Sequence, residues 1–320
     1  DKQGKSTEAV DWLSQALAIS SSIKDAENTA IIQLGLGVVY ENLGRYSQSM
    51  AMYQSALEHW RQTENSIWLA NLLNNLGVLQ HLTGDYKAAI SSYESALQHA
   101  HKSGYARIQA FILTGIGDIY VELNAIDEAR QAYNQAVAIA QKLHIKFLQV
   151  YLQTQEAVIA CAKGNFPDSY RSIEAARAIA TQENMVMELH MCDLEYGGIK
   201  IKEGKPGEVI DRLEKACAFF ESGGHKAQTE KASLYLTLAY GQLHQHEMLL
   251  KHLLKVLATL NEAHKPSLLV ATANRYYDQL VTLRPIDYVE GQLEQLFHSI
   301  TRFWNELPEL RRHLRQHALA

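Results

Sequence analysis

Histidine is the residue type in this chain that most readily suggests metal chemistry, since the sequence contains 14 of them. His313 and His317 are spaced to share one face of a helix, and His244, His246 and His252 form a loose cluster in sequence. No carboxylate or cysteine completes a tetrahedral ligand set at the usual spacing beside either group. We therefore expect no metal site and interpret these histidines as surface or packing residues.

The cysteines do not form a pattern that would support catalysis or a disulfide framework. There are three of them, Cys161, Cys192 and Cys217, without a Cys-x-x-Cys pair. An odd number without paired spacing is typical of a reducing compartment, so we expect a cytoplasmic protein whose cysteines pack between helices. The sequence also has no signal peptide and no apolar run near the ~20 residues that a membrane span needs.

The glycine spacing invites a nucleotide-binding interpretation. Gly35-x-Gly37 and Gly115-x-Gly117 look like the start of a dinucleotide fingerprint, but both lie within predicted helices. The sequence contains no phosphate-binding loop, no His-Glu-x-x-His and no Gly-x-Ser-x-Gly. We therefore predict that the chain is not an enzyme and uses no cofactor.

Nucleic-acid binding receives little support from charge. The chain has 30 basic and 35 acidic residues, for a formal net charge of −5. The basic segment 310–317 is more typical of a solvated helix face, so DNA contact is not expected from this chain. Tyr53, Tyr93 and Tyr133 could stack bases, but a packing role between helices is favoured.

These residues belong to a larger pattern that repeats every 40 positions. Gly37, Gly77 and Gly117 define the step, and it continues through a turn series from Gly44 to His244. A third series runs from Tyr53 to Leu253 and a fourth, of small residues, from Ala16 to Val256. Four series in one register predict a repeat protein.

Each repeat is predicted to form two helices. In the second repeat, two apolar stripes at helical spacing flank Gly84-Asp85. Gly84 is suited to the left-handed position after a helix, and Asp85 is suited to cap the next one. In the third repeat, Asn124 and Asp127 are expected to take these two roles, and Pro206 is expected in the first turn of a helix in the fifth. Small residues in the Gly37 and Ala16 series predict close contact between paired helices.

The third repeat resembles the tetratricopeptide repeat (TPR). It reads Ile116-Gly117-x-x-Tyr120, followed by Ala129, Tyr133 and Ala136, and the resemblance extends over about residues 5–283. It implies an all-α fold, a right-handed α–α superhelix of 40-residue helix pairs. The usual TPR period is shorter, at about 34 residues. The long period of this chain resembles that of bacterial multidomain transcription regulators of the maltose-regulon-activator type, and of some eukaryotic scaffolds.

The same resemblance implies a ligand surface on the concave face, which the first helices of the pairs line. The expected binding residues there are Asn71, Asn74, Asn75, Phe111, Thr114, Asp118, Tyr151, Thr154, Gln155, Glu195 and Tyr235. Apolar residues with directed amides and hydroxyls suit a peptide, a protein segment or a small effector. The alternative is that these side chains pack between neighbouring first helices. Glu156 and Lys200 depart from the repeat pattern, which either a nearby ligand or solvent cavity or ordinary sequence drift would explain.

The ends of the chain predict its organisation. Residues 5–20 match only a second helix, so we expect the first helix of that repeat upstream of the chain. Residues 1–283 are predicted to form the TPR solenoid, with six full repeats, and 284–320 to form capping helices. Two functions remain open: the sensor or interaction domain of a larger bacterial transcription regulator, or a free-standing scaffold for a peptide or protein partner.

Overall fold

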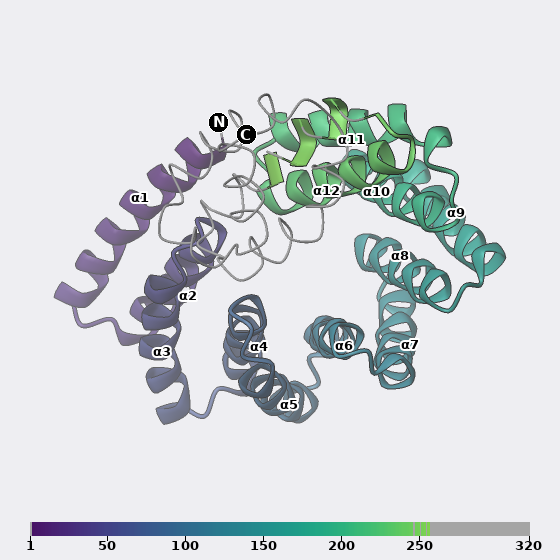
Figure 1. The fold of residues 1–320 in the computed structure, drawn as a ribbon. Helices are drawn as coiled ribbons and strands as arrows, with labels where there is room; N and C mark the ends of the chain where they lie inside the picture. Colours follow the sequence, from purple (N-terminus) through teal and green to yellow (C-terminus); the bar gives the residue numbers. More distant parts are fainter. Residues whose placement is uncertain (1, 246, 250, 254, 257–320) are drawn as a thin grey trace, which may run out of the picture. The chain divides into compact units, whose positions relative to one another are not determined.

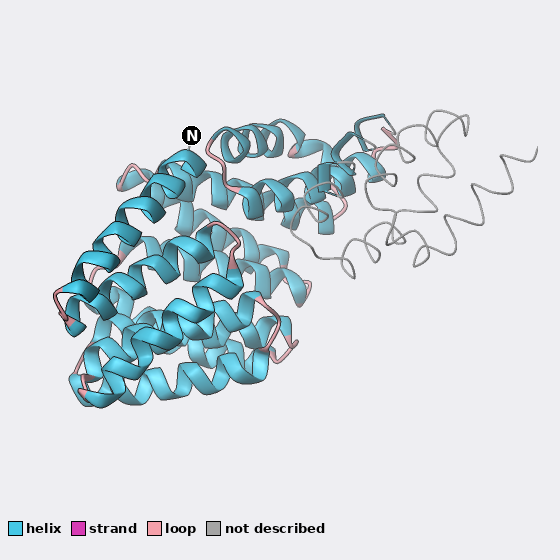
Figure 2. Ribbon diagram, turned by 90° about the vertical axis from the view of Figure 1, so that its left-hand side faces the viewer, coloured by secondary structure: helices cyan, strands magenta, loops and turns pink. Residues whose placement is uncertain are grey.

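The computed structural model describes residues 2–245, 247–249, 251–253 and 255–256. Helices and short loops make up this part of the chain, which contains no strand (Figure 2). The elements are α1 (Lys2–Ser22), α2 (Ala26–Asn42), α3 (Tyr46–Gln62), α4 (Ser66–Leu82), α5 (Tyr86–Ser103), α6 (Ala106–Glu122), α7 (Ile126–Lys142), α8 (Lys146–Ala162), α9 (Phe166–Gln182), α10 (Val186–Lys202), the 3-10 helix η1 (Pro206–Glu208), α11 (Ile210–Ser222) and α12 (Lys226–Gln242). The predicted all-α fold of helix pairs is confirmed.

The chain divides into two compact units, Asp1–Glu188 and Leu189–Ala320, which we call the N-terminal and C-terminal units. Helices α1 to α9 lie in the N-terminal unit, whereas α11, α12 and most of α10 lie in the C-terminal unit. The predicted boundary between residues 283 and 284, and the capping helices after it, lie outside the described residues. That division of the chain stays a prediction.

The connections between helices recur at a regular step, half the length of the repeat, and each contains one residue in the left-handed region. Positive φ angles occur at Lys24, Gly44, Glu64, Gly84, Gly104, Asn124, His144, Gly164, Asn184, Gly204, Gly224 and His244. A left-handed residue ends one helix and turns the chain back for the next. The alternate positions from Gly44 to His244 in this series are those of the predicted turn series.

Both predicted roles are correct in the second repeat, whereas in the third repeat only that of Asn124 is correct. Gly84 has φ of 82°, and the Asp85 side chain accepts a hydrogen bond from the backbone N–H of Ala88. In the third repeat Asn124 is left-handed, but Ala125 is the N-cap residue, and Asp127 lies in the first turn of α7. Asp127 therefore favours that helix through its charge near the N-terminus rather than by capping.

Pro206 lies in the first turn of a helical segment, as expected, but this turn is the short η1, and α11 begins only at Ile210. The proline ring and Gly207 thus replace the first turn of the second helix in this repeat.

Pairs of helices are held together by an aromatic ring packed on a glycine. Tyr53, Tyr93 and Tyr133 are almost fully buried, with exposed fractions of 0%, 1% and 3%. A Cβ atom placed on Gly77 would lie 2.6 Å from Cε1 of Tyr93, and Gly37 and Gly117 face Tyr53 and Tyr133 in the same way. Only a residue without a side chain lets the two helices approach so closely. Both Gly-x-Gly segments lie within helices, as predicted, and the packing interpretation of the tyrosine series is confirmed.

Within the N-terminal unit, the first helices of the pairs lie along the inner side of the array. Figure 1 shows α4, α6 and α8 inside and α5 and α7 outside. Helix α4 contacts α6 as well as its own partner α5. The inner side is thus formed by consecutive first helices.

Candidate inner binding surface

Nine of the eleven predicted binding residues lie on three consecutive first helices of the N-terminal unit. Helix α4 carries Asn71, Asn74 and Asn75; α6 carries Phe111, Thr114 and Asp118; α8 carries Tyr151, Thr154 and Gln155. The other two, Glu195 and Tyr235, lie on α10 and α12 in the C-terminal unit. The structure therefore brings the predicted residues together as two separate sets.

Three residues of the first set are buried. The hydroxyl of Thr114 donates to the carbonyl of Ala110 at 2.8 Å, and that of Thr154 donates to the carbonyl of Val150 at 2.6 Å. Asn74 is 9% exposed, and its Nδ2 donates to Oδ1 of Asn75 at 3.3 Å. These bonds satisfy polar groups within the helices, so the three residues shape the surface more than they present groups to a partner.

Asp118 joins two tyrosines from neighbouring helices. Its Oδ1 accepts hydrogen bonds from the hydroxyl of Tyr133 at 2.6 Å and from that of Tyr151 at 3.0 Å. Burial raises the pKa of the Asp118 carboxyl, while the bonds from both tyrosines act in the opposite direction. Asp118 and Tyr151 thus fasten α6 to α8, as the packing alternative anticipates.

The C-terminal unit contains a comparable link between α10 and α12. Glu195 is only 3% exposed, and its carboxylate pairs with Lys231 Nζ at 2.5 Å. The hydroxyl of Tyr235 donates to the same carboxylate at 3.4 Å. A buried carboxylate needs such partners because the loss of water would otherwise be costly.

The remaining amides and an aromatic pair face the inner side of the N-terminal unit. Asn71, Asn75 and Gln155 are half-buried. Phe111 stacks on Phe147 of α8, with ring centroids 5.7 Å apart and an interplanar angle of 28°. The guanidinium carbon of Arg107 lies 5.9 Å from the centroid of the Phe111 ring. We call Arg107, Phe111 and Phe147 the inner aromatic shelf.

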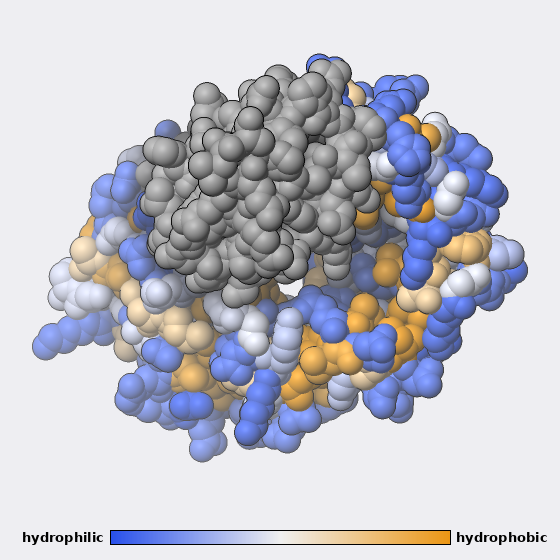
Figure 3. All heavy atoms as spheres, in the orientation of Figure 1, coloured by the Kyte–Doolittle hydropathy of each residue, from blue (hydrophilic) through white to orange (hydrophobic). Residues whose placement is uncertain are grey.

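Sequence reasoning identified Phe111 but missed the other two members of this shelf. Arg107 and Phe147 occupy one repeat position, one helical turn before Phe111 and Tyr151, and Ile67 holds the same position on α4. Phe147 is 38% exposed and Ile67 is 50% exposed. The signal in the sequence that would have found them is their shared repeat position, one helical turn before the predicted contacts Asn71, Phe111 and Tyr151. Figure 3 shows hydrophobic side chains gathered around α6 on this face.

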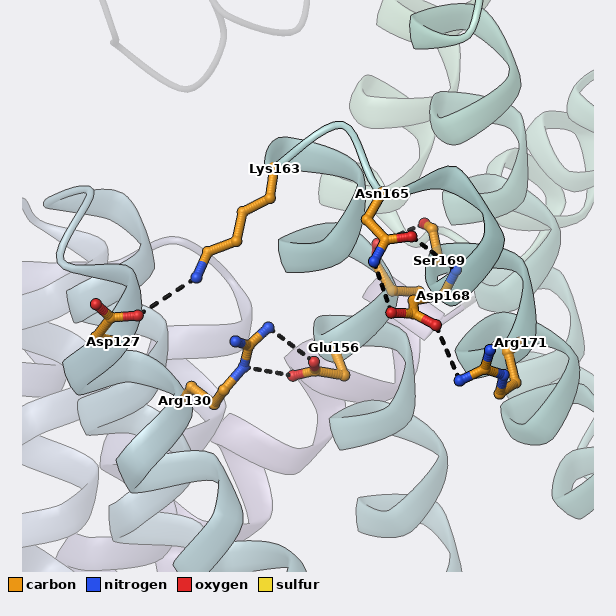
Figure 4. Close-up of polar contacts among 9 residues, drawn as sticks. Asp127, Arg130, Glu156, Lys163, Asn165, Asp168, Ser169 and Arg171 are labelled. Carbon is orange, nitrogen blue, oxygen red and sulfur yellow. Dashed lines mark hydrogen bonds and ion pairs between the residues drawn. The ribbon is translucent and has the colours of Figure 1, made fainter.

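The two departures from the repeat pattern are neutralised by the chain itself. Glu156 pairs with Arg130 of α7 at 2.9 Å (Figure 4). Lys200 pairs with Glu208 at 2.9 Å and with Glu203 at 3.6 Å. A ligand or solvent cavity is therefore not needed to receive either charge, which corrects that interpretation.

Arg130 and Glu156 replace an apolar pair of the earlier repeats. The matching positions hold Ile90 and Ile116 one repeat length earlier, and Met50 and Leu76 two repeat lengths earlier. All four of those residues belong to one apolar cluster. Sequence drift at Glu156 is thus matched by a compensating change at Arg130.

We expect this ion pair to contribute little net stability. Its side chains are 36% and 39% exposed, so Arg130→Ala and Glu156→Ala should each lower the free energy of unfolding by no more than about 1 kcal/mol. The double variant Arg130→Met/Glu156→Leu, which copies the Met50 and Leu76 pair, should match or exceed the parent in stability. Urea denaturation of the four proteins measures this. A double variant less stable than either single one would contradict the proposed exchange of pairs.

Metal ligation and membrane insertion find no support in the described part of the chain. No group of three or more histidine, cysteine or acidic side chains there is arranged to hold a metal ion. All three cysteines are buried thiols, in agreement with a packing role. No described helix combines the length and the apolar character needed to cross a membrane.

The repeated helix pairs and their inner surface define the class of protein, a helical-repeat interaction module. The sequence model of the family described as the MalT-like TPR region matches residues 2–263. The chain therefore belongs to the MalT-like TPR family. A search of curated protein sequences finds no match.

Solved structures with the same fold share little sequence with this chain. RapI in its apo form has a TM-score of 0.65 at 17% identity, over 82% of this chain and 94% of RapI. A Rap protein in complex with competence and sporulation factor has a TM-score of 0.63 at 14% identity, over 91% and 76% of the two chains. BtubC (BKLC) from P. vanneervenii has a TM-score of 0.56 at 14% identity, over 68% and 92%. Identities this low establish the fold alone.

Proposed function

We propose that the inner surface of α4, α6 and α8 binds a polypeptide segment, and that the chain is the sensor or interaction domain of a larger transcription regulator. The observation that carries the first part is the exposure of apolar side chains beside half-buried amides on one face. Ile67 and Phe147 are 50% and 38% exposed, and Asn75 and Gln155 lie on the same row of helices. Burying the apolar groups supplies attraction, and the amides supply selectivity for main-chain groups.

A polypeptide is favoured over a small effector by the form of this surface. The predicted contacts of the N-terminal unit are spread over three consecutive first helices, as a long segment would require. The similarity to a Rap protein solved in complex with competence and sporulation factor agrees with a binding role for this fold. The regulatory context is supported by membership of the MalT-like TPR family. Domains for ATP and DNA binding encoded beside this segment would support that context, and their absence would favour a free-standing scaffold.

The binding proposal can be tested with a library of random linear peptides displayed on phage. Peptides selected on the purified chain are synthesised, and their dissociation constants are measured by fluorescence polarisation. Asn75→Ala, Gln155→Ala and Phe147→Ala should weaken binding about five- to tenfold or more, as loss of about 1 kcal/mol or more at a contact requires. Lys87→Ala and Gln131→Ala, on the outer helices α5 and α7, should leave binding within twofold.

Two results would contradict this proposal. One is a set of selected peptides whose binding depends on Lys87 or Gln131 and not on the inner residues. The other is the failure of repeated selections to yield any specific peptide, while the chain shows a cooperative thermal transition.

A further inference from the structure

We infer that the inner aromatic shelf receives a peptide segment in which a carboxylate lies next to an aromatic or large aliphatic side chain. This inference rests on the proposed function and specifies the partner that the same surface takes. It is carried by the chemistry of Arg107, Phe111 and Phe147, and by the distribution of charge at the ends of the helices that bear them.

The apolar half of the recognition comes from the two phenylalanines. Phe111 is half-buried and Phe147 is 38% exposed, and their ring centroids are 5.7 Å apart in a stacked arrangement. Two stacked rings present a wide flat surface that covers more apolar area than one exposed side chain. An aromatic or leucine side chain laid against this surface would bury it, and aromatic pairs gain further energy from their geometry.

The charged half comes from Arg107, which is exposed and already oriented. Its guanidinium lies over the Phe111 ring, 5.9 Å from the centroid, which favours one position of a long side chain. Arg107 forms no ion pair with any residue that the structure describes. A guanidinium held on one side by a ring can still bind a carboxylate with two parallel hydrogen bonds along its edge.

The surroundings of the shelf favour an anionic partner. The first turns of α4, α6 and α8 contain no acidic residue, although acidic residues are preferred there. The nearest basic neighbour on α8, Lys146, is paired with Glu183 at 3.5 Å. Arg107 is therefore the charge that a partner would meet beside the rings, and a carboxylate complements it.

A single-stranded nucleic acid could also use an aromatic ring and an arginine. The observations favour a peptide, because the shelf offers one guanidinium, which suits one carboxylate. An extended phosphate backbone would instead bring a negative charge with every nucleotide to a chain whose net charge is −5. Octathymidylate is accordingly included as a competitor in the test.

The test uses the same phage-displayed library on four proteins: the parent chain, Arg107→Glu, Phe147→Ala and the outer-helix control Lys87→Glu. Peptides selected on the parent should carry Asp or Glu within two residues of Phe, Tyr, Trp or Leu. These peptides should bind Arg107→Glu more than tenfold more weakly, Phe147→Ala at least fivefold more weakly, and Lys87→Glu within twofold. Selection on Arg107→Glu should replace the acidic residues by Lys or Arg. Arg107 and Lys87 are both exposed, so the charge reversals can be compared in folded protein, which a helical dichroism spectrum verifies.

The outcomes separate this inference from the proposed function. Selected peptides whose binding depends on Asn75 and Gln155 but tolerates both Arg107→Glu and Phe147→Ala would contradict the role inferred for the inner aromatic shelf. The proposed binding on the inner surface would still stand. Octathymidylate that displaces the selected peptides and binds more tightly than they do would overturn the choice of partner. Binding that responds only to outer-helix variants, or no binding at all, would overturn both proposals.

Discussion

Replacement of Gly77 by leucine is expected to lower the free energy of unfolding by about 3 kcal/mol, at the upper end of typical overpacking costs. A Cβ atom at this position would lie 2.6 Å from Cε1 and 2.7 Å from Cδ1 of Tyr93. Tyr93 is 1% exposed and has no room to move aside without separating α4 from α5. Ala96→Leu should have an effect of the same sign, because Ala96 is fully buried on the partner helix.

A matched pair of glycines on α2 provides the control. A Cβ atom on Gly35 would meet only Leu13, at 3.8 Å, whereas one on Gly37 would overlap the Tyr53 ring. Gly35→Ala should therefore stabilise the protein by about 0.5–1 kcal/mol through helix propensity, and Gly37→Ala should destabilise it. Lys87→Ala should change stability by less than about 0.5 kcal/mol. Equal denaturation midpoints for Gly77→Leu and Lys87→Ala would contradict the packing described for the repeat.

Replacement of Asp118 by alanine is the second change with a large expected effect, a loss of about 2 kcal/mol of stability. It removes the acceptor for the hydroxyl of Tyr133, which is 3% exposed, and for the hydroxyl of Tyr151. Asp118→Asn should cost much less, because both hydroxyls bond to the same oxygen, Oδ1, and an amide oxygen can take its place. Chemical denaturation of the three proteins at pH 7 measures the difference. An asparagine variant as unstable as the alanine variant would contradict the role of the shared acceptor.

The parent and Asp118→Asn should also differ in how the free energy of unfolding depends on pH. Burial raises the pKa of Asp118 in the folded state above its unfolded value of about 3.9. The folded protein then binds this proton more strongly than the unfolded one, so the carboxyl favours folding at low pH and this contribution is lost as pH rises through the folded pKa. The unfolding free energy of the parent minus that of Asp118→Asn should therefore fall from pH 4 towards pH 7. A difference that rises over this range would show that the hydrogen bonds from the tyrosines lower the folded-state pKa of Asp118 by more than burial raises it.

Features that repeat with the chain could be predicted from sequence, and features that depend on one pair of side chains could not. Gly77 and Gly84 recur at fixed positions, and their physical roles, close packing and a left-handed turn, need no knowledge of partners. The partner of Glu156 is Arg130 on the preceding helix, and that pairing becomes visible only when α7 and α8 are packed. His144 adopts the left-handed conformation although its side chain gives no sign of it, because the length of the connection imposes the turn.

For the candidate site, the helices could be predicted but the direction of individual side chains could not. The repeat register correctly assigned Asn71, Phe111 and Tyr151 to first helices. It gave no indication that the hydroxyls of Thr114 and Thr154 turn back to their own helix carbonyls, since rotamer choice depends on local crowding. The positions that the family pattern assigns to the concave face begin at Tyr151 on α8. They therefore leave out Phe147, which lies one helical turn earlier. Local packing decides which residues of a predicted face remain available.

Photo-cross-linking tests the central claim, that the inner side of the first helices binds the partner, most directly. A selected peptide carrying benzophenone in place of its key aromatic residue is irradiated with the parent chain, and the adducts are located by peptide mass spectrometry. The adducts should fall on α4, α6 and α8, near Asn71, Phe111 and Tyr151. Adducts confined to α3, α5 and α7 would contradict the claim.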